Sequence, residues 1–108
     1  MKITISPTLL MGAFEYKVKG NSNLIFDENR YGAVTHRTKV VEIDGHILGT
    51  SQALLSYLHE LVHIIDYMFS CKLSDDDVDR IAEGFAEFLV RNWEIELDWS
   101  KIKEDSDA

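Results

Sequence analysis

The sequence predicts a single α+β domain, in which the first half of the chain forms a β-sheet and the second half two main α-helices. Three observations predict this class. Short stretches before residue 50 alternate apolar and polar side chains, two stretches after it repeat apolar residues with helical spacing, and no repeat or linker divides the chain. With 108 residues, 45% of them hydrophobic, the chain buries about two thirds of its surface on folding, enough for a core without disulfides.

The strands are expected in short segments of the first half. Ile3 and Ile5 alternate with polar neighbours, and a turn signal at residues 20–23 separates two later segments. Asp44-Gly45 is a favourable turn pair that ends the last segment. The segments with strand-like or short apolar character are residues 3–5, 14–18, 24–26 and 38–43.

The first long helix is predicted to begin at Thr50 or Ser51, either of which can cap it, and to run to about Cys71 without an internal Gly or Pro. Its apolar side chains cover most of the helix circumference, which predicts a central, buried helix. Its polar side chains form a stripe about 80° wide that consists of Gln52, Ser56, His59, His63, Asp66 and Ser70. So narrow a stripe on a buried helix is expected to line something other than bulk water.

The second long helix is predicted to begin after Ser74, with Asp77 as its capping-box partner. It runs to about Trp93, and the pattern allows an extension toward Trp99. Its apolar face is expected to consist of Val78, Ile81, Ala82, Phe85, Ala86, Phe88 and Leu89. The domain is therefore expected to span residues 1–100, and residues 101–108 are expected to form an acidic, disordered tail.

The candidate functional site is the sequence His59-Glu60-Leu61-Val62-His63. It fits the pattern H-E-x-x-H within a helix, so the two imidazoles lie one turn apart on one face, where they can bind a single metal ion. Glu60 lies about 100° around the helix, within reach of a water at the metal but outside the ligand set. This arrangement is typical of zinc-assisted hydrolysis with the glutamate as general base.

A zinc site that keeps a position open for water needs a third protein ligand. The second helix offers Asp79 and Glu83, one turn apart. Asp79 lies nearer to the buried flank of that helix, and the small side chains of Ala82 and Ala86 allow the two helices to approach. Glu83 has the longer side chain but the less favourable angle. Asp79 is therefore favoured as the third ligand, with Glu83 as the alternative.

Four other residues could in principle contribute to this site. His36 and His46, in the strand half, are weaker candidates for completing it. Cys71 lies eight residues beyond His63, about 12 Å along the helix axis, and is excluded as a ligand of the same metal. Asp66 lies one turn beyond His63 and either orients that imidazole or reaches water at the end of the stripe.

The charge balance excludes some function classes. The chain has 19 acidic and 11 basic residues, a net charge of −8. Such an excess repels phosphate, so neither a nucleic acid nor a membrane is expected as a partner. No apolar run is long enough to span a bilayer, the N-terminus does not resemble a secretory signal, and a single cysteine rules out an internal disulfide. A cytoplasmic location is the simplest expectation.

The histidine motif and its surroundings resemble the small zincin-like metallopeptidases of bacteria and phages that are related to the ImmA/IrrE family. In that family the third ligand is typically a glutamate placed like Asp79, so an aspartate here is a departure. The resemblance implies a minimal zincin-like fold with a small twisted sheet beside the motif helix, a substrate along an edge strand, and in some members a regulatory protein, such as a phage repressor, as substrate. It covers residues 58–67 and 73–85, and more faintly residues 14–18, 31–32 and 39–43.

These observations predict a zinc-dependent metallopeptidase that hydrolyses a peptide bond in a peptide or protein substrate. His59, His63 and Asp79 hold Zn²⁺, and Glu60 activates the attacking water. Residues 38–43 are expected to offer a strand edge to the extended peptide. The alternative is a non-catalytic module whose metal braces the two helices and which binds a regulator without cutting it. Glu60 argues against that alternative, because a structural site does not need a general base.

Overall fold

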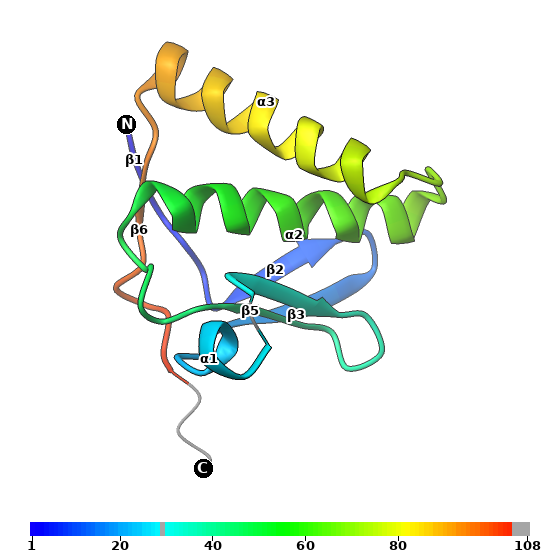
Figure 1. Cartoon of the computed structure of the whole chain (residues 1–108), viewed down its shortest axis with the longest axis horizontal. Helices are drawn as coiled ribbons and strands as arrows, with labels where there is room; N and C mark the ends of the chain where they lie inside the picture. The colour runs from blue at the N-terminus through cyan, green and yellow to red at the C-terminus, as the bar shows by residue number, and fades with distance from the viewer. Residues whose placement is uncertain (29, 105–108) are drawn as a thin grey trace.

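A computed structural model describes residues 1–28 and 30–104 of the chain. Its long helices are α2 (Ser51–Phe69) and α3 (Asp75–Trp93). As Figure 1 shows, α2 runs across one face of the β-sheet, and α3 packs on the side of α2 that faces away from the sheet. The central position predicted for the first long helix is therefore confirmed.

The main sheet has four strands: β2 (Thr8–Met11), β3 (Phe14–Gly20), β4 (Gly32–Thr35) and β5 (Val40–Ile43). Their order across the sheet is β2-β3-β5-β4, with β3 and β5 parallel and the two outer pairs antiparallel. A separate parallel pair joins β1 (Lys2–Thr4) to β6 (Glu96–Asp98), so the N-terminal segment is held beside the chain that leaves α3. The expected α+β class, with a small twisted sheet packed on two main helices, is confirmed.

Two clusters of buried side chains hold these layers together. The larger one fills the space between the sheet and α2, and includes Tyr16, Val41, Ile43, Ile64 and Trp99. The smaller one joins α2 to α3 through Val62, Val78 and Ala82. Ala82 is completely buried, as the small side chain expected at this helix contact requires. The second cluster fixes the position of α3 over the middle of α2, where the histidines lie.

The expectation that residues 24–26 belong to the strand half as an extended segment is wrong. They begin α1 (Leu24–Glu28), a short helix between β3 and β4. The Asp44 carboxylate accepts a hydrogen bond from Ile25 N at 2.9 Å, which satisfies a backbone donor of the first turn. Leu24 is fully buried beneath it. A three-residue apolar run does not distinguish a strand from one helical turn. Here the carboxylate of Asp44, which is distant in the sequence, stabilises the helical turn.

The edge expected at residues 38–43 is also wrong. Thr38 and Lys39 lie in a turn, and β5 is an interior strand between β3 and β4. The edge of the sheet on this side is β4, a strand of only four residues that follows Tyr31. Its sequence, Gly-Ala-Val-Thr, has a weak strand signal because Gly and Ala are poor strand formers, so the sequence did not reveal it.

The helix ends agree with the sequence in part. The capping box of Ser74 and Asp77 is present at the start of α3. The proposed extension toward Trp99 is wrong, because Glu94 adopts a left-handed conformation (φ 50°) and ends the helix, and residues 96–98 form β6. In residues 1–28 and 30–104, none of the helices has the length and hydrophobicity that a bilayer crossing requires.

Residues 101–104, which were expected to belong to a tail, pack on the rest of the domain. Ile102 is buried in the larger core cluster, and Lys103 O accepts a hydrogen bond from Gly20 N at 2.9 Å. The Glu104 carboxylate accepts a hydrogen bond from Ser22 N. Residues 101–104 are therefore part of the domain, and the remainder of the expected tail, residues 105–108, lies outside the described residues.

Candidate metal centre

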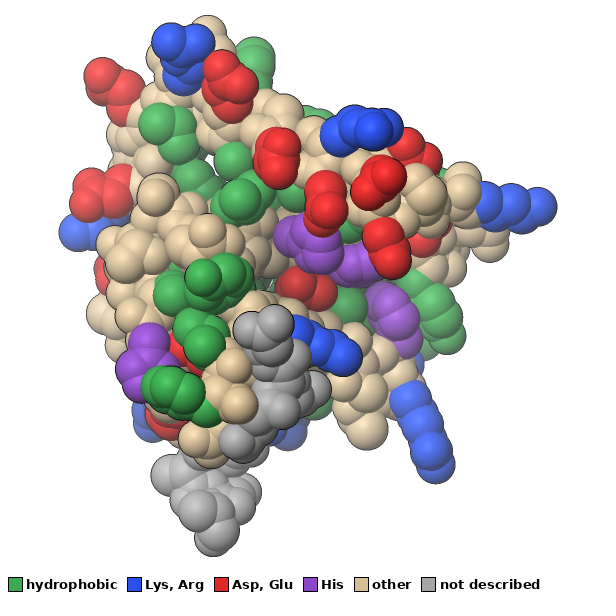
Figure 2. Space-filling model, viewed as in Figure 1, with side chains coloured by type: hydrophobic (Ala, Val, Ile, Leu, Met, Phe, Trp, Pro, Cys, Tyr) green, Lys and Arg blue, Asp and Glu red, His purple; other side chains and the backbone are tan. Residues whose placement is uncertain are grey.

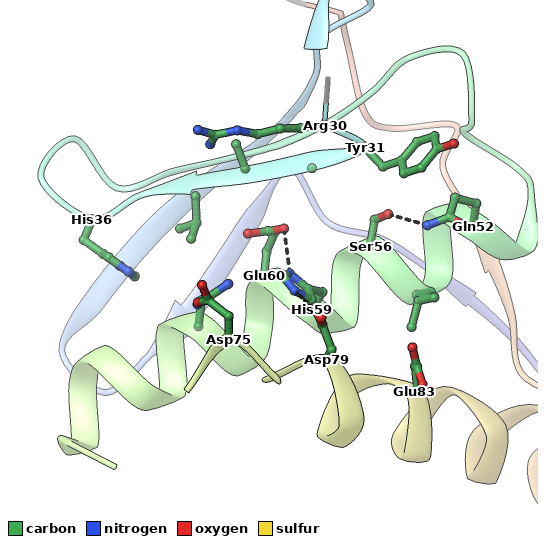
Figure 3. A pocket seen from close by; sticks show the side chains of 15 residues that line it. Arg30, Tyr31, His36, Gln52, Ser56, His59, Glu60, Asp75, Asp79 and Glu83 are labelled. Atoms are coloured by element: carbon green, nitrogen blue, oxygen red, sulfur yellow. Dashed lines mark hydrogen bonds and ion pairs between the residues drawn. The ribbon is translucent and has the colours of Figure 1, made fainter. Parts of the chain in front are cut away.

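A cleft of about 640 Å³ opens between the middle of α2, strand β4 and the first half of α3. Figure 2 shows histidine and acidic side chains gathered around this hollow, and Figure 3 shows that they come from α2, from α3 and, for His36, from the turn after β4. Four residues of the polar stripe on α2 line the cleft: Gln52, Ser56, His59 and His63.

The two histidines of the motif lie side by side on α2, as their spacing requires. Their ring centroids are 4.8 Å apart and their ring planes meet at 75°. His59 is 31% exposed, so its ring reaches the cleft while its neighbours restrict it. Two neutral imidazoles at this separation are suited to one divalent transition-metal ion.

Asp79 approaches the same point from α3. Its Oδ1 lies 2.7 Å from His59 Nε2. Two ligands of one tetrahedral zinc ion, each 2.0–2.1 Å from the metal, are about 3.3 Å apart. The observed pair is thus within about 0.6 Å of that separation, and Asp79 is 55% exposed and free to make the adjustment. The separation of His59 and Asp79 is therefore compatible with two ligands of one Zn²⁺ ion.

Glu83 lines the same cleft one turn further along α3. Among the described residues, no hydrogen bond or ion pair joins its carboxylate to either histidine of the motif. Asp79 already occupies the position beside His59 that a third ligand needs. The geometry supports Asp79 as the third ligand and leaves Glu83 as a second acidic side chain in the wall of the cleft.

Glu60 lies on the other side of His59, toward the sheet. Its Oε2 is 3.2 Å from His59 Nδ1, and the residue is only 5% exposed. A Cβ atom at Gly32, the first residue of β4, would lie 3.1 Å from Glu60 Oε2. The absence of a side chain at Gly32 thus permits the carboxylate to lie against the edge strand. Potential ligand atoms of His59, Glu60 and His63 all lie within 4.8 Å of one another.

The two carboxylates act on the charge of His59. The hydrogen bond with Glu60 raises the pKa of the His59 imidazole, Asp79 raises it further, and burial opposes both effects. Both carboxylates thus favour the protonated form of His59. A metal ion needs the neutral imidazole, so protonation of His59 and metal binding compete at this site.

The weaker histidine candidates lie in different places. His36 lines one end of the cleft, where its ring stacks on Tyr67 (centroids 4.1 Å apart) and its Nδ1 is 3.2 Å from Tyr16 OH. Burial lowers the pKa of His36, and the charge of His63 adds to this effect. His46 is outside the cleft, with its Nδ1 3.0 Å from the Asp44 carboxylate.

Asp66 and Cys71 lie near the end of α2. The Asp66 carboxylate accepts a hydrogen bond from Leu73 N at 3.1 Å, so it holds the turn between α2 and α3. Cys71 is exposed beyond the last turn of α2 and does not line the cleft. The structure brings neither side chain into contact with the histidines of the motif.

Sequence reasoning missed several residues of the cleft. Asp75 lines it from the first turn of α3, a position where an acidic side chain also interacts favourably with the helix dipole. Arg30, Tyr31 and Gly32 line the opposite wall. The sequence signal for this wall is a glycine, Gly32, directly after an aromatic residue, Tyr31. This signal becomes informative only when the close approach of Glu60 to Gly32 is known.

No family model, curated protein or solved structure matches the chain. The resemblance to the ImmA/IrrE family therefore stays a prediction.

Proposed function

We propose that this protein is a zinc-dependent metallopeptidase. The observation that carries the proposal is the pair of His59 and His63 on one face of α2 in an open cleft, with Asp79 beside His59 and the buried carboxylate of Glu60 on the other side of the His59 ring. Three ligands leave one tetrahedral position open, which is the arrangement of a catalytic rather than a structural zinc site.

Each residue then has a defined role. Zn²⁺, when bound, polarises the scissile carbonyl and makes a water more acidic. Glu60 accepts the proton of the attacking water and returns it to the leaving amine. The buried position of Glu60 beside Gly32 holds its carboxylate in place, so little reorganisation is needed when the proton moves.

The proposed substrate is an extended peptide or a segment of a protein. Strand β4 borders the cleft and has a neighbour, β5, on only one side, so its other edge is open to a peptide strand. The edge-strand role expected for residues 38–43 is thus transferred to β4. A specific regulatory protein is a substrate of this kind.

We also propose that nucleic acids are not partners and that the location is cytoplasmic. The net charge of −8 disfavours phosphate-rich partners. The single cysteine, Cys71, is an exposed free thiol, as is usual for proteins of a reducing compartment.

A non-catalytic role is the second candidate, and one observation favours it. Ligand atoms of Glu60 lie as close to those of His59 and His63 as those of a metal ligand would. If Glu60 bound the metal, no general base would remain, and the ion would only brace α2 and the segments around it. The protein would then act by binding a regulator rather than by cutting it.

Substitution of Glu60 by glutamine separates the two candidates. The zinc-loaded protein is incubated with a proteome-derived peptide library, and new termini are identified by mass spectrometry. For the metallopeptidase, Glu60→Gln keeps its zinc but loses cleavage by a factor of about 10² to 10⁴. If Glu60→Gln loses zinc instead, or if the wild type cleaves no peptide, the non-catalytic candidate is favoured.

A further inference from the structure

Helix α3 carries an apolar stripe that nothing in the described part of the chain covers. Ile81, Phe85 and Phe88 lie one turn apart and are 36%, 57% and 49% exposed. Only Val78 and Ala82 of the expected apolar face are buried against α2. We call the exposed surface formed by Ile81, Gly84, Phe85 and Phe88 the α3 stripe.

Gly84 lies in the middle of this stripe and has no explanation within a single chain. A Cβ atom at this position would meet no atom within 4 Å beyond the backbone of its own helix. Glycine inside a helix costs about 1 kcal/mol relative to alanine, and neither a turn nor a neighbouring element requires it here. It leaves a shallow notch beside Phe85, of the kind that lets another helix approach closely.

We propose that the α3 stripe binds the α3 stripe of a second copy of this chain, with the two helices antiparallel. A two-fold axis between residues 84 and 85 places Ile81 against Phe88 of the second copy. The same axis places Phe85 over the notch at Gly84 of the second copy. The stripe is thus complementary to itself, which is what a two-fold contact between identical subunits requires.

The charged residues beside the stripe support the same register. Asp77 pairs with Arg80 at 3.9 Å, and Glu87 with Arg91 at 3.2 Å, all on one flank of the stripe. In the antiparallel arrangement Arg80 lies beside Glu87 of the second copy, and Arg91 lies beside its Asp77. These arginines are the only basic residues of α3, and the four side chains of the two pairs together are neutral although the chain carries a net charge of −8. Two copies can therefore meet here without the repulsion that their overall charge would cause elsewhere.

The size of the stripe predicts a weak and reversible dimer. Residues 77–92 span about 22 Å of helix, and one helix pair of this length is at the small end of protein interfaces. We expect a dissociation constant on the order of 10 to 100 µM. Asp79 and Glu83 project from the opposite side of α3, so the cleft stays open in the dimer, and the proposal is independent of the proposed peptidase activity.

Analytical ultracentrifugation of the full chain between about 5 and 500 µM tests the proposal. The wild type should pass from monomer to dimer within this range. Gly84→Gln fills the notch while improving helix propensity, so it should remain monomeric without a lower melting temperature. Val90→Gln, a change at an exposed apolar residue on the opposite side of α3, should dimerise like the wild type.

A charge exchange tests the antiparallel register. Arg80→Glu and Glu87→Arg should each weaken the dimer several-fold, because each places like charges opposite one another, and the double variant should restore it. A wild type that is monomeric at about 500 µM, or a dimer that persists in Gly84→Gln, would overturn the proposal. A double variant that stays weaker than both single variants would overturn the register.

Discussion

Asp79 and Glu60 approach His59 from opposite sides of its imidazole, and their surroundings suit them to different tasks. Asp79 Oδ1 lies 2.7 Å from Nε2 on a side chain that is 55% exposed, whereas the Glu60 side chain is 7% exposed. An exposed carboxylate can shift by a few tenths of an ångström when a metal ion enters. A buried one keeps its position, which suits the transfer of a proton.

The contact of Asp79 with His59 predicts unequal effects of removing Asp79 and Glu83, two of the acidic residues that α3 presents to the cleft. Asp79→Ala should weaken zinc binding far more than Glu83→Ala, because it removes a charged ligand rather than a neighbour of the site. We expect Glu83→Ala to cost no more than about tenfold in affinity. Competition with a zinc chelator measures both, and a larger loss for Glu83→Ala would identify Glu83 as the ligand instead.

Gly32 provides a second prediction at the scale of one residue. In Gly32→Ala the new methyl group would lie 3.1 Å from Glu60 Oε2 and 3.3 Å from Ile43 Cδ1, so the carboxylate must shift by a few tenths of an ångström. We expect peptide cleavage to fall about tenfold while zinc affinity stays unchanged, because only the general base is displaced. Steady-state kinetics and chelator competition on one preparation check both values. Full activity would show that Glu60 need not lie against β4.

At the scale of elements, the start of α3 determines where the third ligand lies. Ser74 Oγ accepts a hydrogen bond from Asp77 N, and the Asp77 carboxylate accepts one from Ser74 N. Ser74→Ala should lower stability by about 1 kcal/mol, a fall of about 4–8 °C in melting temperature. Ser51→Ala, at the exposed start of α2, should change it by less than about 0.5 kcal/mol. Equal effects of the two variants in thermal unfolding would contradict a cap at Ser74.

The same scale separates what the sequence predicts from what it does not. His59, Glu60 and His63 belong to one helix, so their arrangement follows from helical spacing alone. The position of Asp79 beside α2 also follows from the sequence, because the amphipathic pattern of α3 shows which flank meets α2, whereas its role as a ligand stays a prediction. Gly32 was missed, because its role depends on β4 pairing with β5 and lying beside α2, and no local pattern in four residues shows this.

The burial of α3 shows a second limit of pattern reasoning. The periodicity of its apolar residues predicts a broad buried face, yet only Val78 and Ala82 are buried in the described part of the chain. Amphipathic spacing reports which side chains avoid water, and it does not report whether their cover comes from the same chain. A second copy of the chain that covers Phe85 and Phe88 would therefore account for the apolar pattern as well as burial in the core of the same chain would.

At the scale of the whole molecule, Asp44 connects α1, the segment before β4 and the segment before α2. Its carboxylate is completely buried, with hydrogen bonds from Ile25 N at 2.9 Å and from His46 N at 2.8 Å. Burial alone would raise the pKa of Asp44, but these hydrogen bonds and the His46 ring outweigh it and lower the pKa below its usual value of 3.8. Folding therefore stabilises the charged form of the Asp44 carboxylate.

The stability that Asp44 contributes should therefore be complete above about pH 4 and be lost as the pH falls through the lowered pKa of the folded state. Asp44→Asn should be on the order of 2 kcal/mol less stable than the wild type at pH 7. The difference should shrink as the pH falls through the lowered pKa of Asp44, where the wild type also loses its charge. Denaturant unfolding over a series of decreasing pH values, with the exposed Glu96→Gln as control, measures it. A difference that does not depend on pH would contradict the lowered pKa.

The metal content of the purified chain tests the central claim most directly. Plasma mass spectrometry of protein purified without added metal should find close to one zinc, or a similar divalent ion, per chain in the wild type and in Glu60→Gln. His59→Ala and His63→Ala should be nearly empty, because two remaining ligands hold zinc poorly. A wild type that is free of metal and takes up no added zinc would contradict the metal centre. Loss of the metal in Glu60→Gln would contradict the role of Glu60 as general base.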